Sequence, residues 1–406
     1  MADNPVSELG GKTPLESANT PTMDAMASAG VLGSVLTIPD GMPAGSDVAI
    51  LSIFGCDPRF CYTGRAPLEA AATGINLVAG NVAYRCNMVT FDDSGESFDD
   101  KRLLSHSAGS IEGELSATLI RELFEIPEFA QAAHKAGITV YPALSFRHIA
   151  VQNAADVSDL VLIPPHDNLG KKAGELMPRG GSNAAVLEGL MRLARDLLEN
   201  HPINNKRRQD GEMPANGIWF WAEGTVAQLP SFVEKYGKTG AVVSAVPLCQ
   251  GIGVLTGLDK ISVDGATGVL HTNYEGKVAA AVEALRSRDF AAIHIEAPDE
   301  CSHDGDMEGK LQAIEWIDSR ILAPLIKELS EAKFSDEKTD YRILLISDHK
   351  TLLSTRGHDG TPVPYGIYDS RIDNQTGLTF NETNGSLGNF ISDGLELMSV
   401  LFEDSL

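Results

Sequence analysis

The sequence lacks the marks of a secreted or membrane-bound protein. Its five cysteines are odd in number and form no CxxC pair, which favours reduced thiols over a disulfide framework. No apolar run is long enough to span a bilayer, and no basic-then-apolar signal peptide opens the chain. We therefore expect a cytoplasmic protein that has no membrane partner.

Positive charge is also scarce. The 406 residues hold 32 lysines and arginines against 56 aspartates and glutamates, which gives a net charge of −24. Because the sequence shows no local basic patch, we expect phosphate backbones to repel the chain and exclude a nucleic-acid partner. An anionic substrate would need positive charge from the binding site itself, supplied by metal ions or a few arginines.

Two short apolar runs, each followed by acidic residues and histidines, are the most informative stretches that are present. Ile343 to Ile346 and Ala291 to Ile295 both predict strands buried inside an α/β sheet. Such sheets bind ligands at the carboxyl ends of their strands. Candidate metal ligands follow these two runs: Asp299, His303, Asp348, His349 and His358.

Each Asp/His pair taken alone also has a purely structural interpretation, in which the aspartate caps a helix and the histidine lies on the surface. Taken together, five such groups can hold two divalent cations. Two neighbouring cations stabilise both the attacking and the leaving oxygen in phosphoryl transfer. Carboxylate oxygen and imidazole nitrogen suit borderline metals such as Zn or Mn.

A glycine- and proline-rich loop, PDGMPAGS over residues 39–46, leads into a helix that we predict over residues 47–54. The loop places the Ser46 hydroxyl beside free backbone N–H groups and the positive end of the helix dipole. Ser46 is therefore either a helix cap or a nucleophile that receives phosphate. The candidate metal ligands downstream favour the nucleophile.

Other segments give coarser predictions of secondary structure. Strands are expected over residues 31–38, 82–89, 138–142, 147–151 and 218–221, and helices over residues 23–29, 120–129, 186–199, 273–286 and 307–329. The polar, basic and proline-bearing stretch over residues 200–216 is expected to form a loop.

Several motifs, in order along nearly the whole chain, resemble one protein family. They include GMPAGSDVAILSIFGCDP (41–58), VAYRCNMVT (82–90), PPHDNLGKK (164–172), IEAPDECSHDGD (295–306) and SDH followed by a later His. These resemble the archaeal-type, bisphosphoglycerate-independent phosphoglycerate mutases of the alkaline phosphatase superfamily, a group that includes bacterial relatives proposed as homoserine kinases. The resemblance implies an α/β, doubly wound core over residues 1–90 and 240–406, with a smaller α/β lid domain inserted over residues 91–239.

The resemblance also implies a reaction and a site. Ser46 would form a phosphoserine while 3-phosphoglycerate and 2-phosphoglycerate interconvert. Two divalent ions, Mn, Mg or Zn, would be the cofactors. Asp299, His303 and His358 would hold one ion, and Asp348, His349 and Ser46 the other, while Arg65, Arg85 and Arg147 would bind the phosphorylated substrate. Two alternatives stay open: another small hydroxylated substrate such as homoserine, or a non-catalytic relative. The oligomeric state stays open too.

The chain departs from the family pattern in three places. The family opens with an apolar strand that ends in a GDGMAD-like motif, whose first Asp binds metal. Here Met1-Ala2-Asp3 matches only the tail of that motif, so we expect a groove in the sheet, with unpaired backbone groups on both neighbouring strands. Ser110 follows Ser-Ala-Gly where the family has a histidine, and Lys350 follows the Asp-His pair where the family often has proline.

Overall fold

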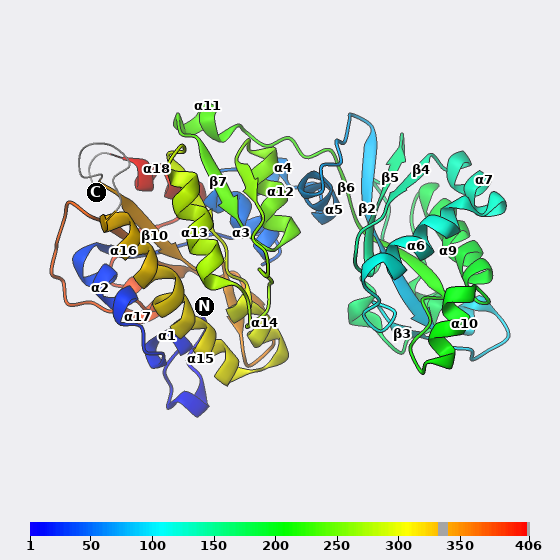
Figure 1. Ribbon diagram of the computed structural model, residues 1–406, viewed down its shortest axis with the longest axis horizontal. Helices are drawn as coiled ribbons and strands as arrows, with labels where there is room; N and C mark the ends of the chain where they lie inside the picture. Colours follow the sequence, from blue (N-terminus) through cyan, green and yellow to red (C-terminus); the bar gives the residue numbers. More distant parts are fainter. Residues whose placement is uncertain (332–339, 404–406) are drawn as a thin grey trace. The chain divides into compact units, whose positions relative to one another are not determined.

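The structure is a computed structural model that describes residues 1–331 and 340–403 and divides into two compact units. Unit 1 comprises Met1–Tyr62 and Gln228–Leu406, and unit 2 comprises Thr63–Ala227 (Figure 1). The inserted unit therefore begins and ends earlier than the predicted range of 91–239. The physical reason is strand β2 (Asn81–Phe91), which pairs along its length with β5 (Arg147–Asn153) and β6 (Gly217–Thr225) inside unit 2.

Unit 1 is built on two separate sheets. In the four-stranded sheet the order is β10 (Arg342–Ile346), β13 (Val363–Asp369), β1 (Val31–Val35) and β14 (Asn389–Ile391). In the three-stranded sheet the order is β8 (Asp259–Ile261), β7 (Gly240–Val243) and β9 (Phe290–Ile293), and all three strands are parallel. A two-stranded ribbon, β11 (Lys350–Leu352) and β12 (Gly357–Asp359), follows β10.

Helices cover these sheets and carry the site residues. Helices α2 and α17 both pack on β1 and β13, and α13 packs on β7 and β9. The helix predicted over residues 307–329 forms as α15 and α16 joined by a π-helical turn. The buried members of its apolar stripe are Ile314, Ile317, Ile321, Leu325 and Leu329. Every helix among the described residues is too short or too polar to cross a membrane. The helices of unit 1 are α1 (Pro14–Ser17), α2 (Pro21–Ala29), α3 (Ser46–Ile53), α4 (Pro58–Cys61), α11 (Phe232–Tyr236), α12 (Pro247–Leu255), α13 (Tyr274–Leu285), α14 (Ala297–Asp304), α15 (Met307–Trp316), α16 (Ala323–Glu331), α17 (Glu382–Gly385) and α18 (Leu397–Phe402).

A groove of about 640 Å³ lies between the two sheets of unit 1. Residues 290–295, from β9 onward, and residues 342–348, from β10 onward, both line it. Within the described residues, β9 is hydrogen-bonded only to β7 and β10 only to β13. Every residue of β9 is half-buried, whereas every residue of its neighbour β7 is buried. Within the described residues, the groove therefore separates β9 from β10.

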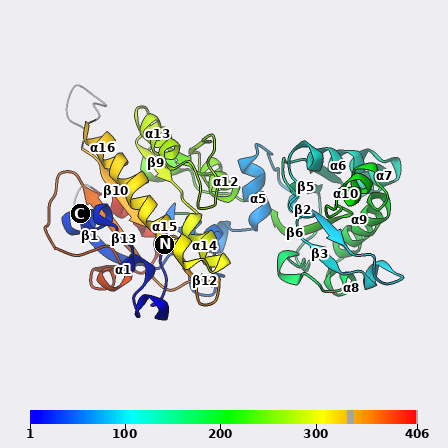
Figure 2. The ribbon, with the colours of Figure 1, turned by 60° about the horizontal axis from the view of Figure 1, so that its bottom comes forward.

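The amino terminus is fixed at one end of this groove. Met1 lines the groove together with Ser347 and Asp348. The backbone N–H of Ala2 donates to the Ser347 hydroxyl at 3.1 Å, and the buried Lys310 ammonium contacts the Asp3 carboxylate at 2.7 Å. Both ribbon views place the amino terminus beside α14 and α15 (Figures 1 and 2). Asp3 is thus a structural ion-pair partner of Lys310.

Unit 2 contains a five-stranded sheet and a large apolar core of its own. Its sheet has the order β3 (Leu103–Ser105), β2, β5, β4 (Ile138–Tyr141), with β6 paired to the other edge of β2. Its buried residues include Phe91, Phe129 and Trp219. The helices of unit 2 are α5 (Arg65–Ala72), α6 (Gly113–Glu125), α7 (Pro127–Lys135), α8 (Ala173–Leu176), α9 (Asn183–Leu198) and α10 (Pro202–Gln209).

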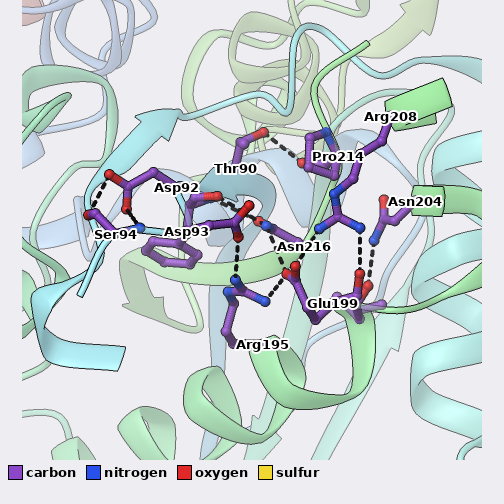
Figure 3. Close-up of polar contacts among 12 residues, drawn as sticks. Thr90, Asp92, Asp93, Ser94, Arg195, Glu199, Asn204, Arg208, Pro214 and Asn216 are labelled. Atoms are coloured by element: carbon purple, nitrogen blue, oxygen red, sulfur yellow. Dashed lines mark hydrogen bonds and ion pairs between the residues drawn. The ribbon is translucent and has the colours of Figure 1, made fainter. Parts of the chain in front are cut away.

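Helix α10 corrects the prediction of a loop over residues 200–216. Its sequence, PINNKRRQ, has no apolar stripe, and side-chain hydrogen bonds hold it in place instead. Glu199 accepts hydrogen bonds from Arg195, Arg208 and Asn216 (Figure 3). The buried Asn204 side chain donates to the carbonyls of Leu198 and Ala215 at 2.8 and 3.0 Å. The network connects α9 and α10 to β2.

We expect Asn204→Ala to destabilise unit 2 by about 1–3 kcal/mol, because two buried carbonyls and the N–H of Ala215 lose their partner. Urea unfolding followed by tryptophan fluorescence measures the change. Asn205→Ala is the matched control, since Asn205 is exposed and makes one side-chain hydrogen bond, to the Asn200 carbonyl. Equal stability of the two variants would contradict the role given to the network.

Candidate metal centre

Asp299, His303 and His358 converge on one point in unit 1. Asp299 and His303 lie four residues apart on α14, and His358 lies on β12. Their ligand atoms all lie within 4.8 Å of one another. The Asp299 carboxylate is 3.3 Å from Nε2 of His303 and 3.4 Å from Nε2 of His358. The structure therefore brings together the three residues that the sequence assigned to one ion.

The orientation of the two imidazole rings favours a cation between them. Nδ1 of His303 lies 2.9 Å from the Arg356 carbonyl, and Nδ1 of His358 lies 3.3 Å from the Ala44 carbonyl. A carbonyl only accepts hydrogen bonds, so each Nδ1 carries its ring's proton and a neutral ring keeps a lone pair on Nε2. These two Nε2 atoms are 2.9 Å apart. Metal-binding histidines are commonly oriented in this way by backbone carbonyls.

The charges around Asp299 agree with a cation site. Burial would raise the pKa of Asp299, but its contacts with His303, His358 and the Thr351 hydroxyl outweigh burial and hold that pKa well below its usual range. In return, the hydrogen bond to Asp299 raises the pKa of His303 to about 9. The carboxylate is thus ionised and ready to bind a cation, and an ion that binds His303 near pH 7 must displace a proton.

Ser46, Asp348 and His349 form a second group beside the first. The Ser46 hydroxyl is 3.0 Å from Nε2 of His349, and the Asp348 carboxylate is 3.3 Å from the same nitrogen. Nδ1 of His349 faces the Lys350 carbonyl at 3.1 Å, so the lone pair of the neutral ring again lies on Nε2. The rings of His349 and His358 are 4.1 Å apart between centroids. All six residues that the sequence assigned to metals therefore form one continuous site.

The position of Ser46 weakens its alternative as a helix cap. Helix α3 begins at Ser46 itself, and the capping position belongs to Gly45. Burial raises the pKa of Asp348, but the nearby charge of His349 lowers it. A hydrogen bond from the Ser46 side chain to Asp348 lowers the same pKa further. The hydroxyl thus faces the candidate metal ligands at the positive end of the helix dipole, where a phosphate group is stabilised.

The three predicted arginines gather in unit 2 around a single acid. Arg85 forms a buried ion pair with Glu69, and the charges of Arg147 and Arg65 also lower the pKa of Glu69, against the larger opposing effect of burial. Burial and the nearby Arg85 lower the pKa of Arg147 to about 10. The Nε of Arg147 is buried without a hydrogen-bond partner among the described residues. Three guanidinium groups around one carboxylate leave an excess of positive charge that suits an anion.

Trp221, His166 and His106 extend the arginine cluster, and none of the three was predicted as a site residue. The guanidinium groups of Arg85 and Arg147 lie 4.6 and 5.4 Å from the Trp221 ring centroid. The His166 ring lies 5.0 Å from Trp221 and 6.1 Å from His106. The one sequence feature that could have marked His166 as a site residue is its position in the family-like motif PPHDNLGKK. Lys171 of that motif is hydrogen-bonded to Asn168 in an exposed position.

Comparisons with known proteins identify the family. The family model described as 2,3-bisphosphoglycerate-independent phosphoglycerate mutase matches residues 27–204. A 2,3-bisphosphoglycerate-independent phosphoglycerate mutase of Methanosarcina barkeri is 44% identical over 392 residues, which are 96% of this chain and 94% of that relative. The chain belongs to this family. A probable member from Geobacter sulfurreducens is 42% identical over 99% of this chain and 97% of its own length.

Two solved structures support the fold of this phosphoglycerate mutase family member. A protein of Pyrococcus horikoshii, 28% identical, covers 100% of this chain and 96% of its own, with a TM-score of 0.79. A cofactor-independent phosphoglycerate mutase of Thermoplasma acidophilum, 25% identical, covers 99% of this chain and 96% of its own, with a TM-score of 0.60. The α/β fold of the alkaline phosphatase type, expected from the sequence, is thus confirmed.

We expect Asp299→Asn and His303→Ala to lower the tightly bound metal content of the protein, since each removes one of three converging ligands. Metal analysis after dialysis against a fixed free Mn²⁺ concentration measures the loss. Asp304→Asn, an exposed position on the same helix, is the matched control. Unchanged metal content in both ligand variants would remove this group from the candidate metal ligands.

Proposed function

We propose that this protein interconverts 3-phosphoglycerate and 2-phosphoglycerate through a phosphoserine on Ser46. The observation that carries the proposal is the Ser46 hydroxyl, 3.0 Å from His349 and hydrogen-bonded to Asp348, at the start of α3. Nearly full-length relatives named as phosphoglycerate mutases support the choice of substrate over homoserine.

The reaction consists of two transfers that mirror each other. The Ser46 oxygen attacks phosphorus, the bond between phosphorus and the substrate's 3-oxygen breaks, and glycerate and phosphoserine result. The proton that Ser46 loses is matched by the proton that the departing oxygen gains. The 2-hydroxyl of glycerate then attacks the phosphoserine, the bond to Ser46 breaks, and Ser46 regains a proton.

Two divalent ions, Mn, Mg or Zn, are the proposed cofactors. Asp299, His303 and His358 would hold one ion, and Asp348, His349 and Ser46 the other. When bound, such ions neutralise phosphoryl oxygens and lower the pKa of the attacking hydroxyl. The residues of the chain orient the reactants: backbone carbonyls hold the rings of His303 and His358, and Ser46 lies at the start of α3, where the helix dipole stabilises a phosphoryl group.

Arg65, Arg85 and Arg147 are proposed to bind the anionic groups of the substrate. Bidentate hydrogen bonds from guanidinium groups match the planar carboxylate and the phosphate of phosphoglycerate. Glu69 holds Arg85 in position, and the buried Nε of Arg147 offers a donor for a ligand oxygen. Unit 2 thus acts as the substrate-binding domain, and we propose that it closes over the substrate as a lid.

We expect Ser46→Ala to lower mutase activity by several orders of magnitude while metal content stays close to that of the parent. Mass spectrometry of the parent protein incubated with 3-phosphoglycerate should show one added phosphoryl group, and the variant should show none. Ser52→Ala is the matched control, because Ser52 lies on the same helix with a buried hydroxyl that has no hydrogen-bond partner among the described residues. A phosphorylated, active Ser46→Ala variant would remove Ser46 from the mechanism.

We expect Arg147→Met to raise KM for phosphoglycerate by about 10- to 100-fold, the effect of losing a charge-assisted hydrogen bond of about 1.5–3 kcal/mol. Initial rates at several substrate concentrations measure the change. Arg121→Met is the control, since Arg121 forms an exposed ion pair with Glu114 elsewhere in unit 2. If both variants keep the parent KM, Arg147 is only a structural residue.

A further inference from the structure

The arginine cluster of unit 2 holds two of its guanidinium groups in different ways. Arg85 uses the in-plane N–H groups of its guanidinium: Nε donates to the Glu69 carboxylate at 2.9 Å, and a terminal nitrogen contacts the other oxygen of the same carboxylate. The Nε of Arg147, by contrast, is buried and has no hydrogen-bond partner among the described residues. Arg85 is therefore committed to Glu69, whereas Arg147 keeps an in-plane donor for a ligand.

Two aromatic rings contact Arg147 instead of a carboxylate. The central carbon of its guanidinium group lies 5.3 Å from the centroid of the Phe146 ring and 5.4 Å from that of the Trp221 ring. Arginine stacks on the faces of aromatic rings, and this kind of contact leaves its in-plane N–H donors available. The same indole ring lies 4.6 Å from the central guanidinium carbon of Arg85, so Trp221 contacts both positive groups.

The pairing of three strands places Trp221 on the same face of the sheet as both arginines. Trp221 of β6 lies opposite Arg85 of β2, and Arg147 of β5 lies opposite Asn87 of β2. Arg85 and Asn87 are two residues apart, and successive side chains of a strand alternate between the two faces of a sheet. The four side chains therefore share one face, and the register of the sheet brings them together.

The buried Asn87 fixes the orientation of the indole ring. Its side-chain oxygen accepts a hydrogen bond from Nε1 of Trp221 at 3.0 Å, and its side-chain nitrogen donates to the His106 carbonyl at 2.9 Å. An indole N–H only donates and a carbonyl only accepts, so these two partners determine which way the Asn87 amide points. The indole ring is thus hydrogen-bonded at its edge, and its face contacts the arginines.

We propose that Trp221, held by Asn87, is a positioning residue that fixes the Arg147 guanidinium group for in-plane binding of an anionic group of the substrate. This inference rests on the proposed function, in which Arg147 binds phosphoglycerate. Without the ring, two nearby charges would move Arg147: Arg85 repels it, and Glu69 attracts it toward a carboxylate that Arg85 already occupies. Contact with the ring opposes both movements and keeps the donors of Arg147 free for a ligand.

The test measures binding of 3-phosphoglycerate to the full chain by isothermal titration calorimetry, in a Ser46→Ala background that cannot form a phosphoserine. Trp221→Leu removes the ring, whereas Trp221→Phe keeps an aromatic ring and loses the N–H. The matched control is Trp219→Phe, because Trp219 is buried on the same strand and donates its own N–H to the Ile163 carbonyl at 2.8 Å. Each variant is also combined with Arg147→Met.

We expect Trp221→Leu to raise the dissociation constant about tenfold, the effect of losing a cation–π contact with a desolvated guanidinium group. Trp221→Phe and Asn87→Ala should each raise it about threefold, because a ring remains but its orientation is no longer fixed. Trp219→Phe should leave it unchanged. In the Arg147→Met background, Trp221→Leu should have no further effect, because a positioning residue acts only through the residue that it positions.

An unchanged dissociation constant in Trp221→Leu would overturn the proposal. So would an equally large increase in the Arg147→Met background, since Trp221 would then only stabilise unit 2, and so would a Ser46→Ala protein that does not bind 3-phosphoglycerate. If Trp221→Leu does not fold, the comparison of Trp221→Phe with Trp219→Phe decides in the same way. The proposed function fails differently: a parent protein that binds phosphoglycerate without converting it would contradict that function and leave these binding results interpretable.

Discussion

The structure of the candidate site depends on where the imidazole protons are. His303, His349 and His358 each direct Nδ1 at a backbone carbonyl, of Arg356, Lys350 and Ala44 respectively. A carbonyl accepts but cannot donate, so the lone pairs of all three neutral rings are on Nε2, facing Asp299, Asp348 and Ser46. In the absence of positive charge, these lone pairs and the carboxylates of Asp299 and Asp348 repel one another. A bound cation, or a proton on His303, relieves that repulsion.

The local parts of the site follow from the sequence, because spacing fixes them. Asp299 and His303 are four residues apart and meet on one helical turn, and Asp348 and His349 follow an apolar run that forms β10. His166 is different: it approaches Trp221 and the arginine cluster only because of the way unit 2 folds. The motif PPHDNLGKK marks residue 166 as part of the family pattern, but it does not encode the approach to Trp221, which depends on long-range contacts.

Two features of the fold escaped prediction for the same reason. Helix α10 has no apolar periodicity, and its position depends on side-chain hydrogen bonds from Asn204 and Arg208 to backbone carbonyls. The boundary of unit 2 depends on which strands pair with β2, and the pairing partners β5 and β6 lie far along the chain. Apolar periodicity reports which face of an element is buried, whereas long-range hydrogen bonds decide which elements belong together.

The groove and the metal ligands are structurally coupled, because strands β9 and β10 line the groove and also lead into the segments that carry the ligands. Asp299 follows β9, and Asp348, His349 and His358 follow β10, so the distance between these two strands sets the distance between the ligands. Within the described residues no backbone ladder joins β9 to β10. A metal ion bound across the ligands would favour one spacing of the two strands. By thermodynamic linkage such effects are reciprocal: an interaction that favours the spacing required by the metal ion tightens metal binding, and the bound ion stabilises that spacing by the same factor.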